Sequence, residues 1–416
     1  MKRTLLIAGA ACAVIALGVL LLALRPERTE TVALRTSERA PDDPRAGLSP
    51  EQQEELQRIA TLGYIAGSEP VPEQTGVVRF ETDAAFHGFT LYTWSEGPAA
   101  VLIDMEGNVI HSWSHPACKS WARARVFENG DLLVITVGYP HLIKLNSRSE
   151  LIWEWNKAAH HDLEVQPDGT IAVLVQETAS RPHFRGGESF LSESVLLLDP
   201  DGTPTRRVSI LEGFERSRSY SDWLEKHPLP DDRDPLHTNS VEIFQEDGRM
   251  FALLSIRNID TVAILDMEAS EIVWATTGPW HKQHEARFVD GNLLLFDNLG
   301  LGEQSRVLEL DTETLEIAWS FTEPGFFTKR FGAQQRLPNG NTLISESEKG
   351  RLVEVTRDGR VVWEYVNPVS AEVGGREVVL GIARAERLPA GFPVEWAAGG
   401  DYRRLSALKA GFRHPR

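Results

Sequence analysis

Three histidines and one arginine occupy related places in a chain built of short repeated segments. His161 and His284 lie 8 and 7 residues before the glycine of an Asp-Gly turn, and His237 lies 11 residues before such a glycine. Arg257 follows His237 by 20 residues. A neutral imidazole is a nucleophile or general base near pH 7, and a guanidinium offers a planar fork for a tetrahedral oxyanion. Brought together, the four side chains would form an anion pocket that also holds a nucleophile.

Two plainer interpretations of these histidines stand beside the chemical one. A single histidine in a β-strand is usually structural, whereas three at matching positions favour a shared functional space. Three histidines are also a zinc-ligand set. No ordered ligand spacing supports a metal here, and a cation beside Arg257 would be unfavourable. We therefore expect neither a metal nor a cofactor.

The neighbouring polar residues carry weaker predictions. Side chains alternate along a strand, so His160 is predicted to point to the face opposite His161. Asp162, Glu164 and Glu242 are candidates for orienting the imidazoles, but strand alternation does not assign them. The histidines beside turns or strand ends are predicted to lie at the surface: His111, His115, His141 and His281.

Five repeated units supply the elements that must position these residues. Each has a short strand, an Asp-Gly or Asn-Gly turn and an aliphatic strand, then after a gap a second turn and a strand that ends in tryptophan. Such turns suit tight antiparallel hairpins. Trp274, Trp319 and Trp363 are spaced by 45 and 44 residues. Four strands in about 45 residues are typical of a β-propeller blade, whereas an open β-sandwich gives no reason for this period.

The two ends of the repeat region complete the ring. Residues 381–391 match a first strand and its turn, and residues 88–113 match three further strands. The prediction is an all-β, six-bladed propeller whose closing blade is shared between the N- and C-terminal strands, which removes exposed sheet edges. The first strands of the blades would bring further residues near the histidines: Trp121, Arg123, Gln334 and Arg384. The tryptophans that end the blades are predicted to pack between blades: Trp113, Trp155, Trp274, Trp319 and Trp363.

A long insertion is predicted over residues 178–234, before His237. It contains Tyr220 and Trp223. Loops of this length in a compact fold are usually lids or substrate walls. A disordered surface excursion is the alternative.

The N-terminal region predicts a membrane anchor followed by a stalk. Lys2 and Arg3 precede 20 uncharged residues, Leu5 to Leu24, which as a helix would span about 30 Å of hydrocarbon. We expect an anchor over residues 1–25, a stalk with a short helix over 26–83 and the propeller over 84–416. The basic start favours a cytoplasmic N-terminus and a body on the extracytoplasmic (periplasmic) face. A cleaved signal peptide is the alternative.

Composition narrows the class of partner. The chain has 416 residues, 42% of them hydrophobic and 25% charged, which supports a sizeable core. Its formal net charge of −17 argues against a nucleic-acid partner, because phosphate contacts need a basic surface. A few local cations still suffice to bind an anionic small molecule. The two cysteines, Cys12 and Cys118, provide neither a disulfide framework nor a zinc motif.

Several of these segments resemble the signature segments of bacterial arylsulfotransferases. They are the His-His-Asp-Leu-Glu segment from His160, Leu-His-Thr-Asn-Ser from Leu236, Ser-Ile-Arg from Ser255 and Gln-His-Glu-Ala from Gln283. The opening Gly-Phe-Thr-Leu-Tyr from Gly88 and the strand and turn from Leu102 to Trp113 are also similar. The resemblance covers about residues 75–368. It implies a six-bladed propeller that moves a sulfuryl group from an aryl sulfate donor to a phenolic acceptor, without a nucleotide sulfate donor.

The resemblance also implies residue roles. Its Gln-His segment carries a nucleophile that forms a transient sulfohistidine, which here is His284. The same comparison assigns binding of the sulfuryl oxygens or proton transfer to His161, His237, Asn239 and Arg257. The characterised enzymes carry an extra N-terminal β-domain and a disulfide-forming cysteine pair, where this chain has a predicted anchor, a stalk and the lone Cys118. A propeller that binds an anionic ligand without turnover and a scaffold for protein partners are the alternative functions.

Overall fold

The computed structural model describes residues 69–397, apart from 95–96, 117, 119, 138–140, 183 and 374–375. The predicted anchor over residues 1–25 and the short helix predicted from Ser49 lie outside the described residues. Within the described part of the chain, no helix combines the length and apolar character needed to cross a membrane.

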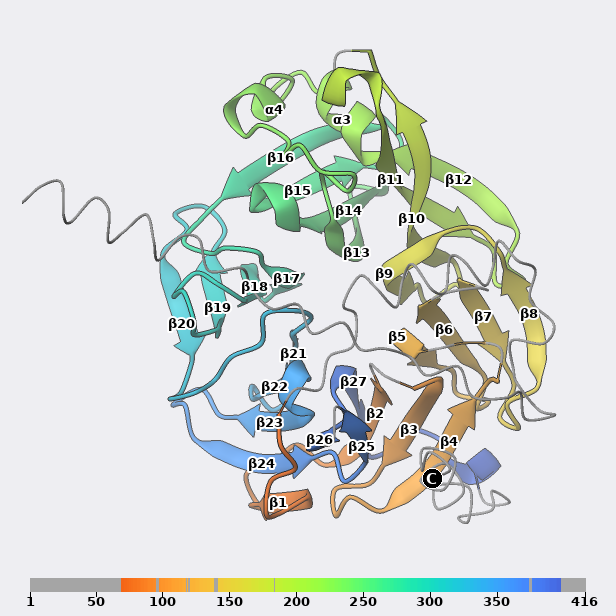
Figure 1. The fold of residues 1–416 in the computed structure, drawn as a ribbon, viewed down its shortest axis with the longest axis vertical. Coiled ribbons are helices and arrows are strands. Elements are labelled where there is room, and N and C mark those ends of the chain that lie inside the picture. Colours follow the sequence, from red (N-terminus) through yellow and green to blue (C-terminus); the bar gives the residue numbers. More distant parts are fainter. Residues whose placement is uncertain are drawn as a thin grey trace, which may run out of the picture. The chain divides into compact units, whose positions relative to one another are not determined.

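The described residues form six antiparallel sheets arranged as the blades of a β-propeller (Figure 1). The first blade contains β5 (Ser120–Val126), β6 (Leu132–Val137), β7 (Leu142–Leu145) and β8 (Leu151–Trp155). The second contains β9 (Ala159–Val165), β10 (Ile171–Ser180), β11 (Ser189–Leu198) and β12 (Pro204–Ser209). The third contains β13 (Thr238–Glu246), β14 (Arg249–Ile256), β15 (Thr261–Asp266) and β16 (Glu271–Thr277).

The remaining three blades follow the same order, with one exception at the closure. The fourth contains β17 (His284–Val289), β18 (Asn292–Asp297), β19 (Arg306–Asp311) and β20 (Ile317–Phe321). The fifth contains β21 (Ala333–Arg336), β22 (Thr342–Glu346), β23 (Arg351–Val355) and β24 (Val361–Val366). The sixth contains β27 (Ile382–Pro389), β2 (Gly88–Trp94), β3 (Ala99–Ile103) and β4 (Val109–Ser114).

The sixth blade confirms the predicted closure, because its inner strand β27 comes from the C-terminal part and pairs with β2. Two additions were not predicted. Strand β1 (Gly76–Phe80) pairs with β24 as a fifth strand of the fifth blade. Strands β25 (Ser370–Val373) and β26 (Arg376–Val379) form a separate hairpin before β27.

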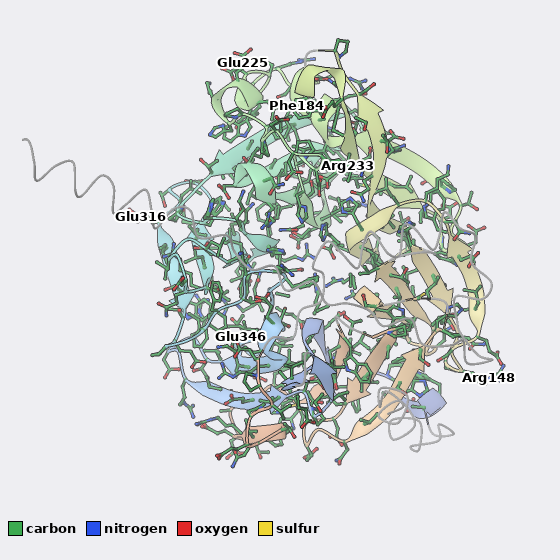
Figure 2. All side chains as sticks on the ribbon, in the orientation of Figure 1. Arg148, Phe184, Glu225, Arg233, Glu316 and Glu346 are labelled. Atoms are coloured by element: carbon green, nitrogen blue, oxygen red, sulfur yellow. The ribbon has the colours of Figure 1, made fainter. Side chains whose placement is uncertain are left out.

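The hydrophobic core lies between successive blades. One cluster joins Leu91 and Leu102 of the sixth blade to Leu132 and Val134 of the first. The tryptophans that end the blades pack in these interfaces, as predicted. The Trp113 and Trp363 side chains are fully buried, and both indoles donate to backbone oxygens of a neighbouring blade or turn, Gly130 and Met105. Trp155, Trp274 and Trp319 are partly buried against such clusters. Charged residues at outer turns point away from the ring, as Figure 2 shows for Arg148 and Glu316.

The insertion is shorter and more ordered than predicted. Strands β10 and β11 extend into residues 178–234 and remain paired as far as Ser180 and Ser189. The segment also contains a short 3-10 turn at Arg185–Gly187 (η1). The other described 3-10 turns lie elsewhere in the chain, at Arg257–Ile259 (η2), Ser347–Lys349 (η3) and Glu395–Ala397 (η4). Helices α3 (Ile210–Arg216) and α4 (Trp223–Lys226) follow β12, and α3 packs on β16. The described part of the segment is therefore ordered rather than a disordered excursion.

Candidate active site

The inner strands bring the predicted histidines together. His161 lies on β9, His237 directly precedes β13 and His284 begins β17, and these strands follow one another around the ring. The His161 and His237 ring centroids are 4.6 Å apart. Arg257 begins η2, and its backbone N–H donates to the carbonyl oxygen of His237 at 3.1 Å. The charge of Arg257 acts on both His161 and His284, so the four residues belong to one cluster.

The tautomer of His284 follows from its partner, Asn298. The Asn298 Nδ2 donates to the carbonyl oxygens of Thr328 and Phe331 at 2.9 and 2.8 Å, which fixes the orientation of the amide. The Asn298 Oδ1 must then accept, and it lies 2.7 Å from His284 Nδ1. The proton of the neutral ring is therefore on Nδ1, and Nε2 carries the lone pair.

Burial keeps the central imidazoles neutral. It lowers the pKa of His284 to about 3, although the hydrogen bond to Asn298 acts in the opposite direction. Burial also lowers the pKa of His161 well below its usual range, and the charge of His237 adds to the effect. A neutral ring with a free lone pair is the form in which histidine attacks an electrophile.

His237 is oriented by a residue that the sequence analysis missed. Its Nδ1 donates to Asp234 Oδ2 at 2.6 Å. Asp234 lies in the segment between α4 and β13, which the Asn258 amide also holds through the Asp234 carbonyl oxygen at 2.8 Å. Burial is the largest single influence and acts to raise the pKa of Asp234, but the hydrogen bonds from His237 and the charges of His237 and His160 together outweigh it, so the pKa is lowered. The sequence did offer a signal for Asp234, because it lies three residues before the candidate His237.

Asn239 holds the strand that carries His284. Its buried Nδ2 donates to the carbonyl oxygen of Gln283 at 2.9 Å. Asp162 Oδ2 and Ser240 Oγ accept from backbone N–H groups of the following blades, at Val241 and Ala286. These matching bonds place Asn239, rather than His237, at the strand position that corresponds to His161 and His284.

The prediction for His160 was wrong. His161 has a φ of 55°, and the pairing of β9 with β10 shifts register here. This left-handed residue breaks the alternation of side chains. The two imidazoles consequently meet with their ring centroids 5.0 Å apart. The His160 Nε2 is buried and lies 3.6 Å from Oε1 of Glu193, a second residue that the sequence analysis missed.

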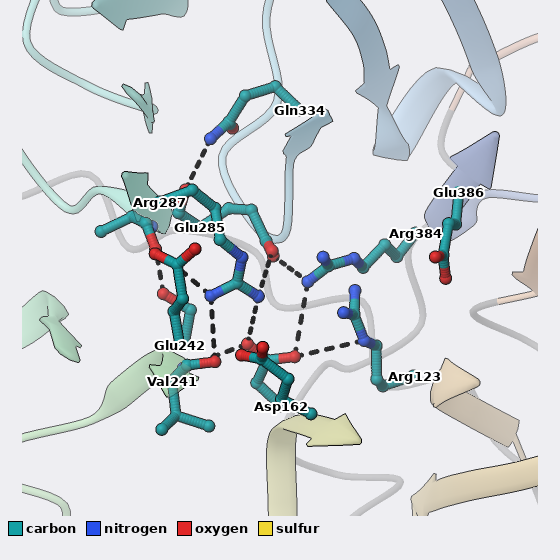
Figure 3. A network of polar contacts seen from close by, with 12 residues as sticks. Arg123, Asp162, Val241, Glu242, Glu285, Arg287, Gln334, Arg384 and Glu386 are labelled. Atoms are coloured by element: carbon teal, nitrogen blue, oxygen red, sulfur yellow. Dashed lines mark hydrogen bonds and ion pairs between the residues drawn. The ribbon is translucent and has the colours of Figure 1, made fainter. Parts of the chain in front are cut away.

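Figure 3 shows an arginine–carboxylate network (Arg123, Asp162, Glu285, Arg287 and Arg384), in which Asp162 and Glu285 directly follow His161 and His284 in the sequence. Asp162 accepts from Arg287 Nη2 at 2.7 Å and contacts Arg123 Nε at 3.2 Å and Arg384 at 3.4 Å. Glu285 pairs with Arg287 at 2.6 Å and with Arg384. These cations are paired with carboxylates, so the network joins neighbouring blades.

Several secondary predictions are settled by the same contacts. Gln334 reaches the network through the Glu285 carbonyl oxygen at 2.5 Å, whereas Trp121 packs in the cluster between the sixth and first blades. Glu164 and Glu242 accept from the backbone N–H groups of Ile243 and Phe288. They join blades and, like Asp162, orient no imidazole.

The histidines expected at the surface differ in exposure: His111, His115 and His141 are partly buried, and His281 is exposed. Of the histidines expected at the surface, His141 lies close enough to His160 to act on its charge, and His281 Nδ1 bonds Asp260 at 2.8 Å. Burial raises the pKa of the Cys118 thiol to about 11. In the part of the chain that the structure describes, no three His, Cys, Asp or Glu side chains gather in a metal-binding arrangement.

Comparison with known proteins supports the fold and shows the family. A protein of unknown function from Bacteroides caccae has 13% sequence identity and a TM-score of 0.50 over 72% of this chain and 98% of that chain. A streptogramin B lyase also has 13% identity, with a TM-score of 0.43 over 78% of this chain and 95% of that chain. A search of curated proteins gave no match. The family model for arylsulfotransferase (ASST) matches residues 123–368, more than half of the chain and all of the histidine cluster. The chain belongs to the arylsulfotransferase family.

Proposed function

We propose that the protein transfers a sulfuryl group from an aryl sulfate ester to a phenolic acceptor, with His284 as the nucleophile. The observation that carries this proposal is the hydrogen bond from His284 Nδ1 to an Asn298 amide of fixed orientation. It leaves the Nε2 lone pair of a neutral, buried ring as the reactive group of the cluster.

The reaction has two displacements at sulfur. In the first, Nε2 of His284 attacks sulfur, an N–S bond forms, and the S–O bond to the aryl group breaks with its electron pair going to the phenolate. In the second, the acceptor phenolate attacks the same sulfur and the N–S bond electrons return to Nε2. The leaving phenolate gains one proton and the acceptor loses one, so protons balance over the cycle.

The other cluster residues would stabilise charge and move this proton. Arg257 and His161 would contact the sulfuryl oxygens, whose charge is spread over three atoms as in a phosphoryl group. His237, held by Asp234 through Nδ1, has Nε2 available for the phenolic proton. Asn239 contributes through the segment that carries His284. We further propose that residues 1–25 anchor the propeller on the extracytoplasmic, periplasmic face of a membrane.

The test is intact-protein mass spectrometry after brief mixing with 4-nitrophenyl sulfate and no acceptor, at neutral or alkaline pH. We expect the mass of one SO₃ group to be gained. His284→Asn should keep the fold and reduce adduct formation by at least about 10³-fold, because the nucleophile is removed. His87→Asn, which changes an exposed histidine, is the control. An adduct retained in His284→Asn would refute the mechanism, and saturable binding without adduct would indicate a binding propeller.

A further inference from the structure

A buried carboxyl group that forms no ion pair with a described lysine or arginine lies beside His160. Glu193, in the middle of β11, is fully buried. Its two oxygens accept the Thr238 N–H at 3.1 and 2.9 Å, and Oε2 accepts the Thr238 hydroxyl at 2.5 Å. Among the described residues, no lysine or arginine forms an ion pair with it. A buried carboxylate without a cation is costly, and such a group commonly binds a proton instead.

The imidazole beside Glu193 offers a lone pair for that proton. His160 makes a hydrogen bond to the Val175 backbone that favours the protonated ring, so a ring N–H donates to the carbonyl oxygen. Nε2 has no hydrogen-bond partner among the described residues, which assigns this N–H to Nδ1. The Nε2 lone pair then lies 3.6 Å from Glu193 Oε1. Two acceptors face each other there unless a proton lies between them.

The surrounding groups decide on which side the proton lies. Burial, followed by the charge of Asp234, raises the pKa of Glu193 to about 8. Burial lowers the pKa of His160 to about 4, and the charges of His237 and His141 act in the same direction. The negative charge of Asp234 partly offsets them at His160. The carboxyl is therefore the stronger binder of the proton.

We propose that Glu193 works as a neutral carboxylic acid, whose oxygens accept the backbone N–H and the hydroxyl of Thr238 and whose proton faces His160 Nε2 across the 3.6 Å between them. This inference rests on the proposed function, because Thr238 lies between His237 and Asn239. Glu193 is a positioning residue: it ties the second blade to the segment that carries His237 and Asn239. Loss of its proton would add a negative charge beside Asp234 and disfavour the approach of an anionic donor.

The test uses Glu193→Gln, which matches the neutral acid because its amide keeps an N–H toward His160 and an oxygen that accepts from Thr238. The readout is the single-turnover rate of 4-nitrophenol release between pH 6.5 and 9.5 without acceptor. Glu193 is protonated below its raised pKa and ionised above it, so the wild-type rate should fall by about tenfold from pH 7 to pH 9. Glu193→Gln should stay within about 3-fold of wild type at pH 7 and show no such fall. Glu177→Gln, at an exposed site on β10, should behave as wild type.

Two results would overturn the proposal. One is the same alkaline fall in Glu193→Gln as in the wild type, and the other is a large loss at pH 7 in a folded Glu193→Gln protein. ¹⁵N NMR of histidine-labelled protein, assigned with His160→Gln, adds a readout that needs no turnover. It should show a neutral His160 ring with the proton on Nδ1 at pH 7, and an imidazolium would contradict the proposal. If wild type forms no adduct, the proposed function fails while this NMR test still stands.

Discussion

At the scale of single residues, the site depends on groups that determine which nitrogen carries a proton. Asn298 does this for His284 and Asp234 does it for His237, each through a ring Nδ1. Both leave an Nε2 lone pair available for chemistry. The two partners differ in charge, because the Asn298 amide is neutral and the Asp234 side chain is a carboxylate. Burial keeps His284 uncharged and the Asn298 amide fixes its tautomer, whereas the Asp234 carboxylate fixes the orientation of His237. The two histidines thus suit the different roles proposed for them, nucleophile for His284 and proton transfer for His237.

Replacing Asn298 with alanine should slow the sulfation of His284 by about 10- to 100-fold, because the ring loses the acceptor that fixes its tautomer. The measurement is the single-turnover rate with 4-nitrophenyl sulfate, together with the ¹⁵N shifts of His284. Gln304→Ala, at a part-exposed amide after β18, is the control. An unchanged rate, with the proton still on Nδ1, would show that Asn298 has only a structural role.

Sequence spacing was sufficient to predict that His161, His237, His284 and Arg257 lie together, because each is a short distance from a turn glycine or from another candidate. It failed at His160, where a left-handed residue reverses the expected side-chain direction. Asn298 and Glu193 could not be found this way. Their roles come from contacts with residues 14 and 45 positions away, on other strands, and nothing near them in sequence indicates those contacts.

At the scale of elements, the period near 45 residues predicted the blades, but the insertion was harder to interpret. Strands β10 and β11 are each 10 residues long and continue past the expected edge of the second blade. Turn residues in the sequence therefore did not mark where these strands end. Helix α3 is capped by Ser209, whose hydroxyl accepts from the Glu212 N–H at 3.3 Å. Its buried Ile210, Leu211 and Phe214 pack into the cluster shared by the second and third blades. The chain that follows delivers Asp234 to His237.

Phe214→Ala should therefore affect both stability and activity. Removing a fully buried phenylalanine costs about 3–5 kcal/mol of unfolding free energy, measured by urea denaturation. We also expect slower turnover with a phenolic acceptor, because a loosened α3 releases the segment that carries Asp234. Glu215→Ala on the same helix removes only an exposed pair with Arg181 and should cost no more than about 1 kcal/mol. If Phe214→Ala lost stability but kept full activity, α3 would have no role in positioning Asp234.

At the scale of the whole molecule, closure joins distant parts of the chain through one buried ion pair. Glu354 on β23 accepts from Arg387 on β27 at 3.1 Å, and both side chains are fully buried. Glu354 also accepts the Phe86 N–H at 2.6 Å, and Arg387 donates to Thr90 on β2 at 2.8 Å. Burial lowers the pKa of Arg387 to about 10, and Glu354 opposes that shift. The fifth blade, β27 and the segment leading into β2 are thus held at one point.

Glu354→Gln should destabilise the propeller by about 3–5 kcal/mol, because it leaves the Arg387 cation buried without a counter-ion. The measurement is urea denaturation, with proteolysis to detect release of β27. The matched control is Glu81→Gln, which breaks the exposed pair between Glu81 and Arg360. That pair also joins the start of the propeller to the fifth blade, yet its loss should cost no more than about 1 kcal/mol. Similar small effects of both substitutions would mean that strand pairing between β27 and β2 closes the ring without the buried charges.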